Sequence, residues 1–228
     1  MTRPLFWSCF YVIINFYIMI INYIYIIMRI ISISVYSKQN NNEPILLASA
    51  DELSFVSIFQ RGTLREFIKF HSRLVVQRTA VDQSLEVALE KGICYSTVNS
   101  DKLAVAIICD EEYPRRVAND LGFKIMEQLT NHIYTNKINV SSFTTDTDIK
   151  FSYLDTVIKE WQNPHEKDGI LKLQGELNDV TNIMKKNLNE LLERNENLEK
   201  LMDKSKDLST TSVQFYKTAK KTNSCCNF

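Results

Sequence analysis

Two adjacent cysteines, Cys225 and Cys226, stand at the end of the chain, which closes with the residues Cys-Cys-Asn-Phe. Cys225 is the fourth residue from the end, the spacing of a CaaX box, and a terminal Phe favours a geranylgeranyl chain on the thiol. The residues just before the pair are polar, whereas a transmembrane helix needs about 20 apolar residues. One lipid chain binds a bilayer only marginally, so a second chain or the basic residues Lys217, Lys220 and Lys221 should contribute. The tail therefore predicts membrane attachment through lipid.

A permanent cation, Arg194, stands in the middle of an apolar stripe that precedes this tail. Members of the stripe alternate three and four residues apart, as in the a and d positions of a coiled coil; they are Ile170, Leu173, Leu177, Val180, Met184, Asn187, Leu191, Arg194, Leu198, Leu201, Ser205, Leu208, Ser212, Phe215, Ala219 and Thr222. A buried guanidinium is costly unless acceptors meet its donors, so this position indicates partner and register selection, not stability. In a shifted heptad Arg194 would be exposed instead. A shift by one residue, however, replaces leucines with Glu193 or Asn195, so we place Arg194 in the seam.

The residues around this arginine resemble a known family. The run 191–198, Leu-Leu-Glu-Arg-Asn-Glu-Asn-Leu, resembles the centre of an R-SNARE motif, and 215–219, Phe-Tyr-Lys-Thr-Ala, resembles its C-terminal end. The resemblance implies a parallel four-helix bundle with three Q-SNARE helices, each presenting a glutamine to Arg194 in the central layer. It further implies that Leu191, Leu198 and Leu201 form flanking layers. Zippering toward Cys225 would pull two bilayers together.

The tail is similar to that of the Ykt-type R-SNAREs, the prenylated members of the longin group. Asn223-Ser224-Cys225-Cys226 matches their pattern, in which the second cysteine is prenylated and the first can be palmitoylated. Only two residues follow Cys226 here, so by position the prenyl acceptor is Cys225. Two alternatives stay open: double prenylation, as in the Cys-Cys-x-x ending of Rab GTPases, or a natural chain that is one residue longer. In each case a cytosolic prenyl transferase is the implied partner, and no cofactor is expected beyond covalent prenyl and palmitoyl lipid.

About 130 residues of globular composition precede the stripe, enough for one domain. Alternation of apolar and polar residues predicts a strand from Ile31 to Tyr36. Similar patterns predict strands at Ile45 to Ala48, Leu85 to Leu89, Ile93 to Val98 and Leu103 to Cys109. Helices are predicted after a capping box at Thr63-Leu64-Arg65-Glu66, after Pro114, and from Leu154 to Trp161 before Pro164.

This order of elements is that of the longin fold. Phe59-Gln60-Arg61, Glu112-Tyr113-Pro114 and Gln162-Asn163-Pro164 also resemble Ykt-type longin sequences. We therefore expect an α+β, profilin-like longin domain at 28–162, with a sheet sandwiched by helices. A single coiled-coil SNARE helix at 163–222 and a lipidation tail at 223–228 should follow. The resemblance implies that the longin domain folds back on the SNARE helix and shelters the lipid, with Phe70 in the groove; periodicity alone makes Phe70 a plain core aromatic.

The first 27 residues do not fit this plan. Leu5 to Ile27 carries no charge and is long enough for a transmembrane helix. Its Ile, Tyr, Asn and Phe composition is typical of translated A/T-rich non-coding DNA, and the first longin strand follows at once. We therefore predict that Met28 is the true initiator and that 1–27 is a hydrophobic leader upstream of it. The alternative is a real N-terminal anchor.

Other functions have little support. The histidines are scattered, no glycine-rich phosphate loop occurs, and Cys94 and Cys109 are expected to be buried thiols in a reducing compartment. The formal net charge is +0 without a sustained basic run, which disfavours nucleic acid as a partner. No metal site and no enzymatic activity are expected.

The sequence thus predicts a lipid-anchored longin R-SNARE that cycles between the cytosol and the cytoplasmic face of Golgi, vesicle and endosomal membranes. Two alternatives stay open: a non-fusogenic longin adaptor of SNARE assembly, and an N-terminally anchored coiled-coil tether if residues 5–27 span a membrane.

Overall fold

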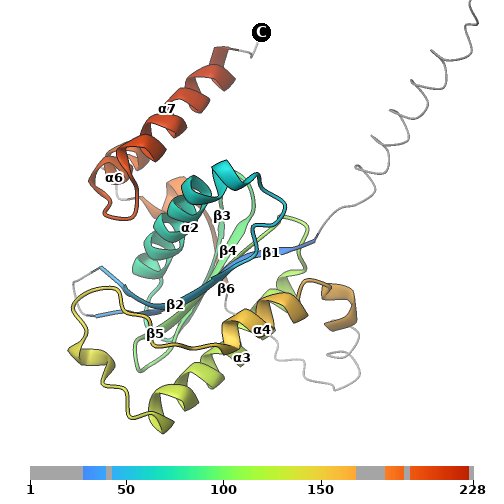
Figure 1. The fold of residues 1–228 in the computed structure, drawn as a ribbon, viewed down its shortest axis with the longest axis vertical. Helices are drawn as coiled ribbons and strands as arrows, with labels where there is room; N and C mark the ends of the chain where they lie inside the picture. The colour runs from blue at the N-terminus through green and yellow to red at the C-terminus, as the bar shows by residue number, and fades with distance from the viewer. Residues whose placement is uncertain (1–27, 40–42, 168–182, 193–195, 226–228) are drawn as a thin grey trace, which may run out of the picture.

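A six-stranded mixed sheet forms the centre of the computed structural model, which describes residues 28–39, 43–167, 183–192 and 196–225 (Figure 1). The strand order is β2-β1-β5-β4-β3-β6, and every neighbouring pair is antiparallel except β3 and β6, which are parallel. The strands are β1 (Ile30–Ser37), β2 (Ile45–Asp51), β3 (Gln83–Ala88), β4 (Ile93–Val98), β5 (Leu103–Cys109) and β6 (Ile183–Asn187). The five strands predicted from alternation are therefore confirmed to within a few residues.

Helices cover both faces of the sheet. On one face lies α2 (Ile58–Arg78), and on the other lie α3 (Arg115–Thr135) and α4 (Tyr153–Glu160), with the short turn η1 (Val140–Ser142) between them in sequence. Each face has its own buried apolar cluster, since strand side chains alternate between the two faces. This arrangement confirms the predicted longin-type α+β fold.

The first helix begins earlier than the capping box predicted. Its N-cap is Ser57, not Thr63, and the Glu66 carboxylate accepts a hydrogen bond from the backbone N–H of Ser209 instead of capping its own helix. A long-range contact thus replaces the local one that the sequence suggested.

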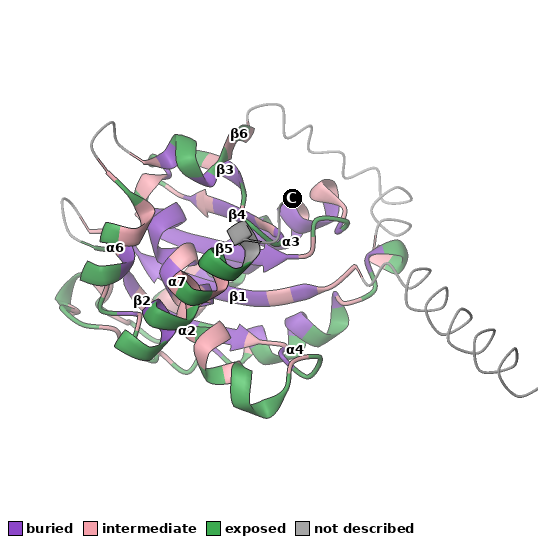
Figure 2. Cartoon of the chain, turned by 90° about the horizontal axis from the view of Figure 1, so that it is seen from above, coloured by how far each residue is buried: buried purple, intermediate pink, exposed green. Residues whose placement is uncertain are grey.

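The described part of the predicted SNARE helix is divided into several elements and is not one continuous helix. It consists of β6, the turn η2 (Leu188–Leu191), α6 (Leu198–Lys204) and α7 (Thr210–Cys225), all packed against the longin domain (Figures 1 and 2). The physical reason is that an apolar stripe without partner helices must find another apolar surface, and the domain offers one. The free edge of β3 also supplies hydrogen-bond partners that turn Ile183–Asn187 into a strand.

Local signals mark the breaks between these elements. The side chain of Asn187 accepts from the N–H of Glu190 in a capping box, and that of Asn197 accepts from Glu199 at the start of α6. The chain leaves α6 at Ser205 in an extended conformation.

Several predictions lie outside the described residues: the leader 1–27, the stripe from Ile170 to Val180, Arg194 and Cys226. Among the described residues, no helix combines the length and apolar character needed to cross a membrane.

Candidate functional site

The surface between the longin domain and the C-terminal segment (the described residues from 183 onward) holds most of the predicted functional side chains. Its first part is the pairing of β6 with β3, in which Ser84 to Ala88 lie opposite Ile183 to Asn187 in parallel register. The ammonium of Lys185 adds an ion pair with Glu86 at 3.4 Å. Because β6 is the last strand of the sheet, its departure would leave the edge of β3 open.

The second part of the surface is an apolar cluster between α2, the sheet and the C-terminal segment. Leu188, Leu191, Met202 and Val213 are buried there together with residues of the longin domain. Leu198, Leu201, Leu208 and Tyr216 pack against it with partial exposure. The three leucines predicted to flank the central SNARE layer, Leu191, Leu198 and Leu201, therefore face the longin domain in this structure.

Phe70 belongs to the same buried cluster. It projects from α2 with 5% of its surface exposed, and its ring meets that of His71 edge-on at 5.2 Å. Phe70 thus shares one buried cluster with side chains of the C-terminal segment, and its role in closure stays a prediction.

A buried ion-pair network ties the C-terminal segment to α2. The guanidinium of Arg73 donates to both oxygens of Asp207, with Nε–Oδ2 at 2.6 Å and Nη2–Oδ1 at 3.0 Å. It also donates to both carboxylate oxygens of Asp146 and to the carbonyl of Pro44. Lys69 approaches the same two carboxylates, at 2.8 Å from Asp146 and 3.4 Å from Asp207.

The side chain of Asp207 is only 1% exposed, so its charge depends on these partners. Burial opposes charging of Arg73, but the hydrogen bonds to Asp207 and Asp146 outweigh it and raise the pKa of the guanidinium. Burial likewise opposes charging of Asp146, yet hydrogen bonds from Arg73 and Lys69 hold the pKa of that carboxyl well below its usual range. Arg73 and Asp146 therefore stay charged near neutral pH.

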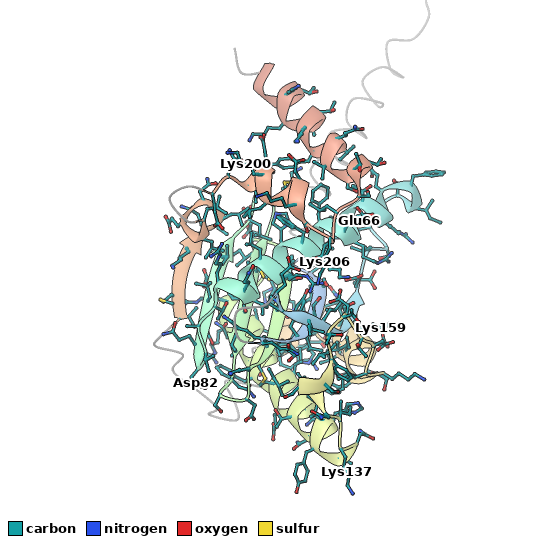
Figure 3. The ribbon with its side chains drawn as sticks, turned by 90° about the vertical axis from the view of Figure 1, so that its left-hand side faces the viewer. Glu66, Asp82, Lys137, Lys159, Lys200 and Lys206 are labelled. Carbon is teal, nitrogen blue, oxygen red and sulfur yellow. The ribbon has the colours of Figure 1, made fainter. Side chains whose placement is uncertain are left out.

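Three further polar contacts join the same two parts of the chain. Arg78 donates to Glu196 at 2.6 and 2.8 Å, and the N–H of Ser209 donates to Glu66 at 2.8 Å. Figure 3 shows Glu66 on α2 beside the C-terminal segment that carries Lys206. Tyr216 donates to Glu90 at 2.9 Å, and burial together with this hydrogen bond raises the pKa of its phenol to about 12.

An apolar hollow of about 210 Å³ lies beneath α7. Its lining combines α2, the sheet and α7 and includes Leu64, Phe67, His71, Phe215 and Ala219. The Nδ1 atom of His71 lies 2.8 Å from the carbonyl oxygen of Phe67, and burial lowers the pKa of the imidazole. A neutral histidine thus faces the space under the helix that ends at Cys225.

The sequence predicted the leucines and Phe70 of this site but missed its charged residues. Arg73 follows Phe70 by three positions, so the two residues share one face of the helix. The other residues of that face are apolar, and a cation among them could have indicated a buried ion pair. Asp207 lies just outside the stripe, next to Leu208, where a coiled coil expects an exposed polar residue. Nothing in the sequence pairs it with Arg73. Within the ranges that the structure describes, no group of His, Cys, Asp and Glu could hold a metal ion.

A longin-type domain that carries a heptad segment on its surface defines the class of longin SNAREs, and comparisons with known proteins agree. The Regulated-SNARE-like domain (Longin) family model matches residues 52–158, and the Synaptobrevin model matches residues 169–226.

The chain matches several curated relatives over nearly the whole length of each relative. The "Synaptobrevin homolog YKT6" of Debaryomyces hansenii is 39% identical over 79% of this chain and 90% of the relative. The protein of the same name in Yarrowia lipolytica is 36% identical over 83% and 94%, and the Schizosaccharomyces pombe homolog is 34% identical over 87% and 98%. The chain belongs to the YKT6 family of longin R-SNAREs, which act in vesicle trafficking together with other SNAREs.

Proposed function

We propose that this chain drives an intracellular membrane fusion step by zippering with three Q-SNARE helices. Zippering would run from Ile170 toward Cys225, with Arg194 meeting one glutamine from each partner in the central layer. Leu191, Leu198 and Leu201 would form the flanking layers. The YKT6 relatives and the synaptobrevin match support this role. We assign the chain no enzymatic activity and no resident cofactor.

The observation that carries the regulatory part of the proposal is the conformation of the C-terminal segment. A SNARE helix in a four-helix bundle is continuous, whereas here residues 183–187 are extended along β3 and the helix breaks at Ser205. Leu191 cannot lie in the longin cluster and in a bundle layer at the same time. The closed arrangement therefore competes with Q-SNAREs for the same side chains, and each can form only at the expense of the other.

We further propose that Cys225 and Cys226 carry the lipid that attaches the protein to Golgi, vesicle and endosomal membranes, with one prenyl chain added by a cytosolic transferase and a palmitoyl chain as the second. The apolar hollow under α7 supports partial cover of this lipid in the closed form, because α7 ends at Cys225. The mass of a C-terminal peptide from the native protein would identify the chains.

Phe70→Glu tests the gating role of the longin domain. A carboxylate at this buried position has no partner prepared for it, so we expect it to weaken the closed arrangement and raise the membrane-bound share in a cytosol–membrane fractionation. Phe123→Glu is a matched control, since Phe123 is 40% exposed on α3, on the other face of the sheet. An unchanged distribution for Phe70→Glu would remove Phe70 from the gate. Lipid mixing between vesicles distinguishes the alternative function. If the opened, lipidated chain bound Q-SNAREs but caused no lipid mixing, it would be a non-fusogenic adaptor.

A further inference from the structure

Three large apolar side chains project into solvent where α2 begins. Phe55 is 46% exposed, Ile58 72% and Phe59 93%. They lie within five positions of one another, across the loop after β2 and the first turn of α2. Single exposed apolar residues are common on soluble domains, whereas several gathered at one place form a candidate interaction surface. We call Phe55, Ile58 and Phe59 the apolar tip.

The backbone under the apolar tip is held in a fixed shape. Leu53 is buried and anchors the loop, and the N–H of Val56 donates to its carbonyl. Arg61 reaches back from α2, donating through Nε to the carbonyl of Val56 at 2.9 Å and through Nη2 to that of Ser54 at 3.2 Å. The tip is therefore presented without a need for ordering on binding, which favours association.

Charges around the apolar tip are balanced. Arg29, whose guanidinium lies 4.1 Å from the centre of the Phe55 ring, pairs with Asp110. Arg65 pairs with Asp51 at 2.9 Å. Because these charges are paired, a positively or negatively charged partner surface would gain little electrostatic attraction here. The apolar tip therefore suits a partner that is recognised by apolar contact.

The position of the apolar tip points to a membrane. In Figures 1 and 3, the N-terminal end of α2 lies in the same half of the molecule as α7, at the height where α7 begins, and away from the end of α3 near Lys137. Ile58 and Phe59 are too exposed to line a groove of their own, and they lie in the first turn of α2, where apolar side chains are free to contact an apolar phase. We propose that the apolar tip inserts into the interface of a lipid bilayer and orients the longin domain beside the lipidated tail.

A fluorophore attached at position 59 of the full chain would report whether the apolar tip enters the bilayer. Phe59→Cys would carry an environment-sensitive fluorophore in a background of Cys9→Ser, Cys225→Ser and Cys226→Ser, because the remaining Cys94 and Cys109 are buried. With neutral phosphatidylcholine vesicles we expect a blue shift and quenching by lipids brominated near the headgroup. The balanced charge predicts little change when phosphatidylserine or salt is added. This background removes the lipidated thiols, so the result does not depend on the fusion activity proposed above.

Tyr134 provides the matched control, since it is 86% exposed at the other end of the molecule. The same fluorophore at Tyr134→Cys should stay in water. The double variant Ile58→Ser with Phe59→Ser should lower the vesicle-bound to free ratio by about tenfold or more, whereas Tyr134→Ser should not. A water-like signal from position 59 on bound protein, or unchanged binding of the double variant, would overturn the proposal. A blue shift that grows with protein concentration without vesicles would also overturn it, in favour of self-association.

Discussion

At the scale of single residues, Asp207 is the most informative side chain of the closed arrangement. Its carboxylate is buried against Arg73 and Lys69, although its place outside the heptad stripe would expose it on a SNARE bundle. Hydrogen bonds between charged groups stabilise by about 1.5–3 kcal/mol each, and a buried charge without its partner is costly. Asp207 thus stabilises the closed form, whereas it does not belong to the a and d positions that would pack in a SNARE bundle.

Asp207→Asn should therefore weaken the closed form by about 1–3 kcal/mol, and Q-SNARE binding should tighten because the competing state is less populated. A urea titration of a fluorophore pair spanning the longin domain and α7 measures this change. Asp203→Asn is the matched control, because Asp203 pairs with Lys217 at 2.8 Å on the exposed surface, where a pair is worth less than about 1 kcal/mol. Equal effects of the two variants would contradict the role given to Asp207.

His71 gives the closed form a pH dependence of known sign. Burial lowers the pKa of its imidazole in the closed form, although the hydrogen bond with the Phe67 carbonyl and the charge of Glu90 oppose the shift. The closed form then binds fewer protons than an open form with an ordinary histidine, whose pKa is about 6.5. The stabilising effect is complete above that value and is lost as the pH falls below it.

We expect the closed fraction to fall when the pH is lowered from about 7.5 to 5.5, and His71→Gln should flatten this dependence. The fluorophore pair used for Asp207 provides the measurement. His132→Gln, on α3 at the other face of the sheet, should leave the dependence unchanged. A closed fraction that rises on acidification would show that the sign is wrong.

At the scale of elements, β6 shows where sequence reasoning reached its limit. The five strands of the longin domain follow from alternation, and α3 follows from the proline that precedes it. Residues 183–187, Ile-Met-Lys-Lys-Asn, fit the heptad stripe as well as any strand pattern, because a five-residue segment carries too little periodicity to decide. Their conformation depends on β3, which lies about 100 positions earlier in the chain and offers a free edge.

The pairing of β6 with β3 predicts a specific exchange pattern. The amides of β3 that donate to β6 should exchange hydrogen faster in Asp207→Asn than in the native chain, because the edge is uncovered each time the segment leaves. Amides of β5, in the middle of the sheet between β1 and β4, should not change. Hydrogen exchange followed by mass spectrometry reports both strands in one experiment. Faster exchange in β5 as well would indicate global unfolding instead of release of β6.

At the scale of the whole molecule, the proposed function requires the same apolar side chains to serve two alternative partners. The longin domain and the C-terminal segment share one buried cluster, one ion-pair network and one sheet. The sequence indicated closure only through family resemblance, because the heptad stripe describes the bundle state and the contacts of the closed state cross long distances along the chain. Leu191 and Phe70 were predictable as buried residues, whereas Arg73, Asp207 and Glu196 were not predictable as partners.

The distance between the longin domain and α7, measured with and without Q-SNAREs, tests this account most directly. Spin labels at Lys91→Cys and Gln214→Cys, with Cys9, Cys225 and Cys226 replaced by serine, would sit on exposed positions on either side of the contact. We predict a short distance for the chain alone and a long one once the SNARE motifs of three Q-SNAREs are added, with Arg194→Ala weakening this response. A short distance that persists in an assembled SNARE complex would contradict the competition between closure and zippering.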